Sequence, residues 1–196
     1  MKTGILFTLT ALLLVSCTSE KEQPARQAAQ ISPFEQVREQ TVKDPKDVDA
    51  WSRLADMYES SQMYSEEAAA LKTIITLKPD KRYAYVRLGN TYNRLGRYQE
   101  AIDAFLAGAK YPPQDPVLYN NLAASYGMLG KTDREIAALK KAIVLRPHYA
   151  TARYNLGVVY LKNGRREEAL KQYNELNKFD EGTAQALKKE IDTIRK

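Results

Sequence analysis

The sequence has few of the residues on which catalysis and metal binding usually depend. Its 196 residues include one cysteine, Cys17, and one histidine, His148. A Cys/His metal site needs more ligands than these two, and no disulfide can form within the chain. His148 stands in the loop-like segment RPHYA, where we expect a solvated histidine. The sequence therefore predicts no metal site, no cofactor and no histidine-based catalysis.

Other signatures of an enzyme are also missing. The sequence contains no evident nucleophile–base pair and no phosphate-binding loop. Acidic pairs occur at Glu66 and Glu67 and at Glu167 and Glu168, but both pairs fall at expected helix starts, where carboxylates suit the helix dipole. We expect these acids to be solvated, and we predict that the chain is not an enzyme and has no catalytic residue.

The charge is basic overall but unevenly distributed. The formal net charge is +6, residues 49–81 are acidic on balance, and residues 82–149 are rich in Lys and Arg. Such a basic stretch can bind polyanions. Its charges are interleaved with acids, however, as on a solvated helical surface. Polyanion binding through Lys140, Lys141 and Arg146 is kept as an alternative, and no nucleic acid partner is expected.

The first residues have the pattern of an export signal. Lys2 gives a short positive region, and residues 4–15 form an apolar run of about a dozen residues. A helix that spans a membrane needs about 20 such residues, whereas a signal peptide needs fewer. Residues 1–16 are therefore predicted to be a signal peptide that is removed on maturation.

The end of this segment, LVSC at residues 14–17, resembles the lipobox of bacterial lipoproteins. The resemblance implies that Cys17 is lipidated and becomes the first mature residue. Several acyl chains would anchor it durably, since each buried CH₂ contributes about 0.8 kcal/mol. Thr18 follows, so no Asp marks retention at the inner membrane. The resemblance favours the cell envelope, at an outer membrane facing the periplasm if the organism has one. An ordinary signal peptide with an unrelated cysteine is the alternative.

The lipidated cysteine is followed by a polar stretch. Residues 17–32 contain one proline and no apolar period, which predicts a flexible tether. About 15 extended residues reach at most roughly 50 Å, so the folded part can stand away from the lipid.

The rest of the chain repeats with a constant period, equal to the step from Leu54 to Leu88. A leucine, a small residue and a tyrosine recur in the same register, and a proline keeps the same step. The recurring positions are Leu54, Leu88, Leu122 and Leu156; Ala55, Gly89, Ala123 and Gly157; Tyr58, Tyr92, Tyr126 and Tyr160; and Pro79, Pro113 and Pro147.

Within a unit, the apolar spacing is that of two helices. Positions i, i+3, i+4 and i+7 are apolar or small from Tyr85 to Tyr92, and Gly96 is placed to end that helix. Ala101, Phe105 and Gly108 form a second stripe. We expect YPPQDP, at residues 111–116, to stop the second helix, because proline cannot continue one.

This pattern resembles the tetratricopeptide repeat, whose unit has the same length as the period seen here. The resemblance covers residues 48–181 as four repeats, and it implies an all-α, right-handed superhelix of helix-turn-helix units. Some positions depart from the family pattern, which affects the local packing expected there and not the period. They are Gln62, where the family has the turn glycine; Glu67 and Glu135, where the family prefers Ala; and Arg153, where the family has a large aromatic residue.

Capping helices are predicted at both ends of the array. Residues 33–47 follow Ser32, a plausible helix cap, and begin with Pro33. Residues 182–196 would cover the other apolar end. The apolar stripe expected on that helix consists of Ala186, Leu187, Ile191 and Ile194.

In this family the first helix of each repeat lines a concave groove that binds partner proteins. Asn suits the backbone of an extended peptide, and Tyr offers rigid contact area with a polar tip. Structural roles for some of these asparagines are the alternative. The predicted partner groove consists of Tyr83, Val86, Asn90, Asn93, Asn120, Asn121, Tyr154, Asn155 and Val158. We expect its repeat-one end, with Asp56 and Glu59, to be acidic.

The resemblance implies an anchored, non-enzymatic adaptor or scaffold that binds an extended segment or a helix of another protein. Alternatives are an assembly factor for a pilus, a secretin or an outer-membrane complex, and an adaptor for peptidoglycan enzymes. Family members that grip chaperone carboxylate tails use basic groove residues. Val86, Thr151 and Asn155 stand at those places here, so no such clamp is predicted. The sequence leaves the oligomeric state open.

Overall fold

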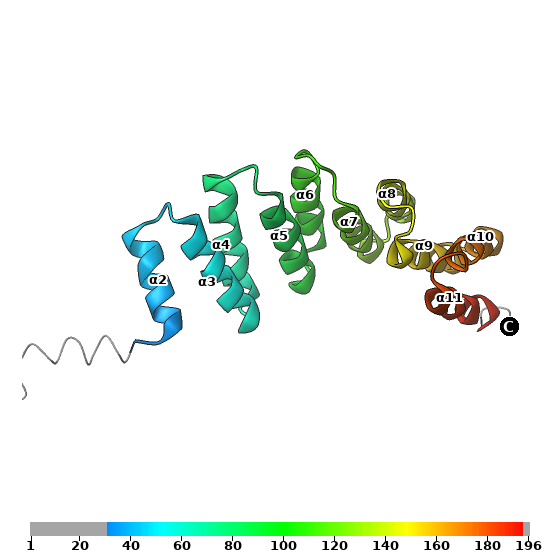
Figure 1. Ribbon diagram of the computed structural model, residues 1–196, viewed down its shortest axis with the longest axis horizontal. Helices are drawn as coiled ribbons and strands as arrows, with labels where there is room; N and C mark the ends of the chain where they lie inside the picture. Colours follow the sequence, from blue (N-terminus) through cyan, green and yellow to red (C-terminus); the bar gives the residue numbers. More distant parts are fainter. Residues whose placement is uncertain (1–30, 194–196) are drawn as a thin grey trace, which may run out of the picture.

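The computed structural model describes residues 31–193, which form ten α-helices and no strand (Figure 1). The predicted signal peptide, the lipidation site Cys17 and nearly all of the tether lie outside the described residues. The helices are α2 (Pro33–Lys43), α3 (Val48–Ser60), α4 (Tyr64–Leu77), α5 (Arg82–Arg94), α6 (Tyr98–Gly108), α7 (Pro116–Met128), α8 (Thr132–Leu145), α9 (Ala150–Lys162), α10 (Arg166–Leu176) and α11 (Glu181–Thr193).

The helices stack as four hairpins between two single helices. The pairs α3/α4, α5/α6, α7/α8 and α9/α10 are the hairpins, and each second helix also packs against the first helix of the next pair. Helix α2 packs on α3, and α11 packs on α9 and α10. The hairpins follow one another in chain order along an arch (Figure 1). The expected all-α superhelix of four repeats with capping helices is confirmed.

The repeated tyrosines occupy equivalent interior places. Tyr92, Tyr126 and Tyr160 are 4–7% exposed, and the leucines four residues before them are also buried. Tyr58, in the first repeat, is half-buried and meets the ring of Phe34 in α2, edge to face, with 5.4 Å between centroids. The tyrosine of the first repeat is therefore covered by the N-terminal capping helix.

The small residue of the pattern marks a close approach between helices, within the hairpin at Gly89 and against the capping helix α11 at Gly157, where a Cβ would lie 2.6 Å from Leu187. A Cβ added to Gly89 in α5 would lie 2.5 Å from the ring of Phe105 in α6, which is inside van der Waals contact. Phe105 itself is fully buried. A larger residue at position 89 would push α5 and α6 apart, which explains why the repeat places glycine or alanine there.

Each hairpin turn uses one residue with a left-handed backbone. Gly96, Gly130 and Gly164 have φ of +66° to +71°, and Gln62 takes the same conformation in the first repeat, with φ of +58°. In every turn the next residue donates its N–H to the carbonyl of the repeated tyrosine; for Arg97 and Tyr92 the distance is 2.8 Å. The turn geometry is therefore kept in repeat one although its glycine is absent.

Arg153 replaces an aromatic residue without loss of a hydrogen bond. In the first repeat, Trp51 donates its indole N–H to the carbonyl of Pro45 at 3.0 Å. In the fourth repeat, Arg153 donates Nε–H to the carbonyl of Pro147 at 2.9 Å. Both pairs occupy the same positions of the repeat pattern, so the guanidinium reproduces the contact of the indole.

The N-terminal capping helix begins with a capping box. Ser32 accepts the N–H of Glu35, and the Glu35 carboxylate accepts the N–H of Ser32. Pro33 occupies the first turn, where a missing N–H costs nothing. The sequence signals at the start of the folded region therefore act as expected.

Two details of the sequence prediction were wrong. In α11 the buried residues are Ala184, Leu187 and Ile191, whereas Ala186 is exposed; Ile194 lies outside the described residues. Ala186 follows Ala184 by two positions, which places it on another face of the helix. Helix α6 ends at Gly108, before residues 111–116 that were expected to stop it.

The turn of repeat one yields a prediction about stability. The substitution Gln62→Gly should raise the free energy of unfolding by about 0.5 kcal/mol. It relieves about 1 kcal/mol of strain in the left-handed backbone. Part of this gain is lost because glycine has more conformational freedom in the unfolded chain. Gly96→Ala is the matched control and should lower it by about 1 kcal/mol, since it introduces the same strain. Urea unfolding measures both changes, and a loss of stability in Gln62→Gly would contradict the assignment.

Candidate functional site

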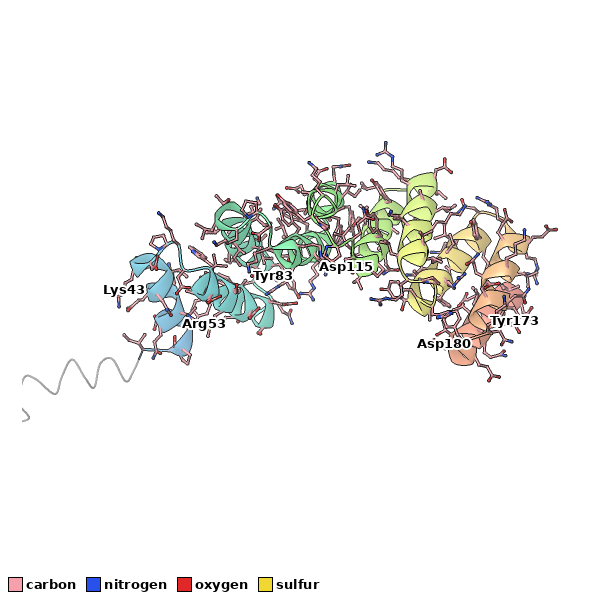
Figure 2. The ribbon with its side chains drawn as sticks, turned by 45° about the horizontal axis from the view of Figure 1, so that its top comes forward. Lys43, Arg53, Tyr83, Asp115, Tyr173 and Asp180 are labelled. Atoms are coloured by element: carbon pink, nitrogen blue, oxygen red, sulfur yellow. The ribbon has the colours of Figure 1, made fainter. Side chains whose placement is uncertain are left out.

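All nine residues of the predicted partner groove lie on the first helices α5, α7 and α9. Tyr83 is 43% exposed, and the other eight are half-buried. Tyr83, which Figure 2 labels, lies in the first turn of α5, and its hydroxyl is hydrogen bonded to that of Ser52 in α3 at 3.0 Å. The structure therefore places these residues on neighbouring helices, partly open to solvent.

Four of the groove asparagines form one chain of hydrogen bonds across three repeats. Asn155 donates its amide to Asn120 at 3.0 Å, and Asn120 donates to Asn121 at 3.2 Å. Asn121 in turn donates to Asn90 at 2.9 Å. We call these four residues the asparagine ladder. Within residues 31–193, the Asn90 amide N–H₂ and the Asn155 side-chain oxygen have no hydrogen-bond partner. The ladder therefore joins the repeats and ends in one free donor and one free acceptor.

Asn93 is held differently, by a residue that the sequence analysis missed. The hydroxyl of Ser125 donates to the Asn93 side-chain oxygen at 2.8 Å, and Ser125 is fully buried. Its place in the repeat, just before the repeated tyrosine Tyr126, is also polar in repeat two, where Thr91 is 1% exposed. A small hydroxyl residue recurring beside a buried tyrosine was the signal that could have identified it.

The acidic end of the groove is partly neutralised inside the chain. Asp56 and Glu59 of α3 both accept hydrogen bonds from Arg87 of α5, and Arg94 binds Glu59 at 2.7 Å. Arg87 also binds Glu67 of α4, at 3.2 Å. Two guanidinium groups therefore lie among three carboxylates, which reduces but does not remove the acidic character expected of the repeat-one surface.

Glu67 corrects an expectation. It was expected to be solvated at the start of a helix, but its side chain is 1% exposed. Helix α4 packs against α5, and this contact turns Glu67 toward Arg87 and away from water. Glu66, beside it, is exposed as expected, as is Glu167, and Glu168 pairs with Arg165 at 2.9 Å.

Arg87 is held in its charged form by these carboxylates. Burial lowers the pKa of Arg87, but hydrogen bonds and attraction from Asp56 and Glu67 outweigh it and raise the pKa above the ordinary value. Arg87 is therefore a structural cation that ties α3 and α4 to α5. It is not available as a free counter-charge for a ligand.

A cavity of about 640 Å³ opens between repeats three and four. Groove residues from α7 and α9 line it, together with Gly127, the first turns of α8 and a residue of α11. The groove members among them are Asn120, Tyr154, Asn155 and Val158. The cavity also contains Glu135, whose pKa is raised by burial although Lys162 opposes the shift. This is the part of the predicted groove with room for a ligand side chain.

The basic residues considered for polyanion binding lie on or beside α8. Lys140 is exposed, Lys141 lies over the ring of Tyr119 at 5.9 Å, and Arg146 lies over Tyr149 at 5.0 Å. His148 is exposed and its ring contacts Phe179 at 4.9 Å. Two of the three cations thus rest on aromatic rings of the chain's own hairpins.

The described residues offer no metal site and no membrane-crossing helix. Within residues 31–193, no group of three or more His, Cys, Asp and Glu side chains could hold a metal ion. None of the helices in that range has the length and apolar character needed to cross a bilayer.

The stacked hairpins define an α-helical repeat protein of the solenoid class. Its units are tetratricopeptide repeats: three sequence models of this repeat match residues 68–116, 129–164 and 150–183. The matches begin within α4, so α3 and the turn at Gln62 lie outside them, although the structure gives repeat one the same hairpin. Repeats of this kind generally serve as protein interaction modules.

Solved structures of tetratricopeptide-repeat proteins share this fold. A crystal structure of MamA has a TM-score of 0.72 at 22% identity, over 85% of this chain and 98% of that one. MamA from Desulfovibrio magneticus RS-1 has a TM-score of 0.67 at 18% identity, over 82% of this chain and 93% of that one. YrrB, described as a TPR protein with an unusual peptide-binding site, has a TM-score of 0.63 at 18% identity, over 81% of this chain and 92% of that one. No curated protein sequence matches the chain.

The two acidic residues that depart from the repeat pattern should respond oppositely to neutralisation. Glu67→Gln should lower the free energy of unfolding at pH 7 by about 1–3 kcal/mol, because a buried charged hydrogen bond is lost. Glu135→Gln should raise it, because a desolvated carboxylate is replaced by a neutral amide.

The pH dependence separates these two cases. The raised pKa of Glu135 means that the folded protein binds its proton more tightly than the unfolded chain. Ionised Glu135 therefore costs stability at neutral pH, and the cost disappears as the pH falls through the raised pKa toward the ordinary carboxylate range. Urea unfolding from pH 7 to pH 4 should show the advantage of Glu135→Gln shrinking. A loss of stability in that variant at pH 7 would contradict the desolvated state of Glu135.

Proposed function

We propose that this chain is a non-enzymatic adaptor that binds an extended segment of another protein along the groove formed by α5, α7 and α9. The observation that carries the proposal is the asparagine ladder beside the cavity between repeats three and four. The ladder is fixed by its own hydrogen bonds, so its free donor and acceptor are held in place before a partner arrives. Such preorganisation reduces the entropy cost of binding.

The groove also offers apolar contact area next to these polar groups. Tyr154 and Val158 line the cavity and are half-buried, so a partner can still cover them. Rigid aromatic side chains of this kind are frequent anchors at protein interfaces. The peptide-binding site named for YrrB is consistent with this use of the fold.

A free carboxylate tail is a poor candidate for the partner. The groove positions Val86, Thr151 and Asn155 carry no positive charge. Arg87 and Arg94, which lie on the groove-lining helix α5, are already bound to carboxylates of the chain. A carboxylate entering there would lose its hydration without gaining a counter-charge.

We further propose that the adaptor acts in the bacterial cell envelope, anchored through lipid on Cys17. The support is the sequence of residues 1–17 alone, with its short apolar run and its single cysteine. Residues 17–32 would then act as the tether between the anchor and the first capping helix. The alternatives of a pilus, secretin or outer-membrane assembly factor and of an adaptor for peptidoglycan enzymes differ in the partner, not in the mode of binding.

Groove binding predicts a loss of partner capture. Asn121→Ala combined with Tyr154→Ala should reduce crosslinked partner recovered from intact envelopes by about tenfold, the effect of losing one or two interface anchors. The control is Lys140→Ala combined with Lys178→Ala, two exposed lysines of the second helices and their loops, which should capture as the wild type does. Thermal unfolding must show all proteins folded. Equal capture by wild type and the groove variant would refute the groove.

Lipid anchoring predicts a change in partition. Cells grown with an alkyne-labelled palmitate should label the wild-type protein and leave Cys17→Ser unlabelled. The wild type should sediment with membranes, and Cys17→Ser should not, because acyl chains supply the membrane affinity. A wild-type protein without label in the soluble fraction would contradict the anchor and leave the groove proposal standing.

A further inference from the structure

Two equivalent positions of the array carry a glutamate, but within residues 31–193 only Glu67 makes an ion pair. Glu67 and Glu135 lie two repeats apart, near the start of the second helices α4 and α8. Glu67 is 1% exposed and binds Arg87 at 3.2 Å. The carboxylate of Glu135 has no hydrogen bond and no ion pair with any residue in 31–193.

The repeat register explains this difference. The position of Arg87, counted two repeats further, is Asn155, which is neutral and donates to Asn120 in the asparagine ladder. The other two carboxylates around Arg87 are Asp56 and Glu59, and their equivalents are Ala124 and Gly127. Repeat three therefore keeps the glutamate, but the cation and the two neighbouring acids are replaced by an amide and two small residues.

These replacements leave open space beside Glu135, whereas the equivalent space beside Glu67 is filled by Arg87, Asp56 and Glu59. Asn155, Ala124, Gly127 and Glu135 all line the cavity of about 640 Å³. Gly127 leaves room for the carboxylate in its present position, because a Cβ there would lie 2.6 Å from a carboxylate oxygen of Glu135. The Glu135 carboxylate thus rests on bare backbone at the side of the groove, where a ligand can reach it.

The charges around the cavity favour a cation as the occupant. Burial raises the pKa of Glu135, the response of a carboxylate that has lost water without gaining a counter-ion. Lys162 lowers the same pKa through space but makes no ion pair with it in the described chain, and Glu190 is a second acid at the cavity wall. Aliphatic groups of Leu139, Val158 and Val159 also line the cavity. They suit the methylene stem of a long basic side chain.

We propose that an arginine side chain of the bound segment enters this cavity and pairs with Glu135, as Arg87 pairs with Glu67 inside the chain. The inference rests on the proposed function and specifies the partner: an extended segment with an arginine at the residue that faces repeats three and four. Arginine is chosen over lysine because the internal example is a guanidinium, whose planar donors also match the neighbouring free oxygen of Asn155.

The test uses a random peptide pool displayed on phage and selected on the immobilised folded chain. Arginine should be enriched about tenfold at one position of the peptides that bind the wild type, the enrichment given by one good ion pair. Glu135→Gln should remove the enrichment. Asn155→Arg should remove it as well, because it supplies in cis the guanidinium that Arg87 supplies to Glu67. Glu66→Gln, an exposed acid on the equivalent helix of repeat one, is the control and should keep it.

The outcomes separate this inference from the function on which it rests. Peptides that bind the wild type without preference for arginine, or with a preference that survives Glu135→Gln, would overturn the arginine site and leave the groove. Selection of lysine in place of arginine would overturn the guanidinium assignment. A wild-type chain that selects no peptide would overturn both proposals. Circular dichroism of each variant confirms that it is folded before selection.

Discussion

The structure depends on the close approach of neighbouring helices at a small residue that recurs once in every repeat. One helix pair leaves an apolar face open, and only the next pair can cover it. Where Gly89 meets Phe105, the distance leaves no room for a larger side chain. A constant step then brings Tyr92, Tyr126 and Tyr160 to equivalent interior places, and it places the first helices side by side. The groove is a consequence of this spacing.

Much of this architecture could be predicted because the information is local and repeated. Short-range geometry is enough to predict the turn at Gly96, the cap at Ser32 and the apolar stripes of the helices. Because the repeat pattern occurs four times, its assignment does not depend on a single copy. Prediction failed at the chain end, where Ala186 was expected in the buried stripe and proved to be exposed. Helix α11 is not one of the paired helices of the four described repeats, so those repeats offer no second copy against which its register can be compared.

The candidate site was less predictable, because its character depends on contacts between repeats. The sequence identified the asparagines but not that Asn155, Asn120, Asn121 and Asn90 bind one another. Pairing between side chains that lie about one repeat apart in the sequence is determined by the tertiary structure, so local sequence patterns do not reveal it. Glu67 shows the same limit: its place in the pattern suggested a solvated acid, and only the neighbouring helix determines that it meets a guanidinium.

The uneven distribution of ion pairs gives the arch two mechanically different halves. Arg87 and Arg94 clamp the junction of repeats one and two to three carboxylates, whereas the first helices of repeats three and four are joined by the neutral amide contact between Asn155 and Asn120. Fewer strong contacts across a joint lower the free energy of opening it. We therefore expect the first helices of repeats three and four to separate at a lower free-energy cost than those of repeats one and two.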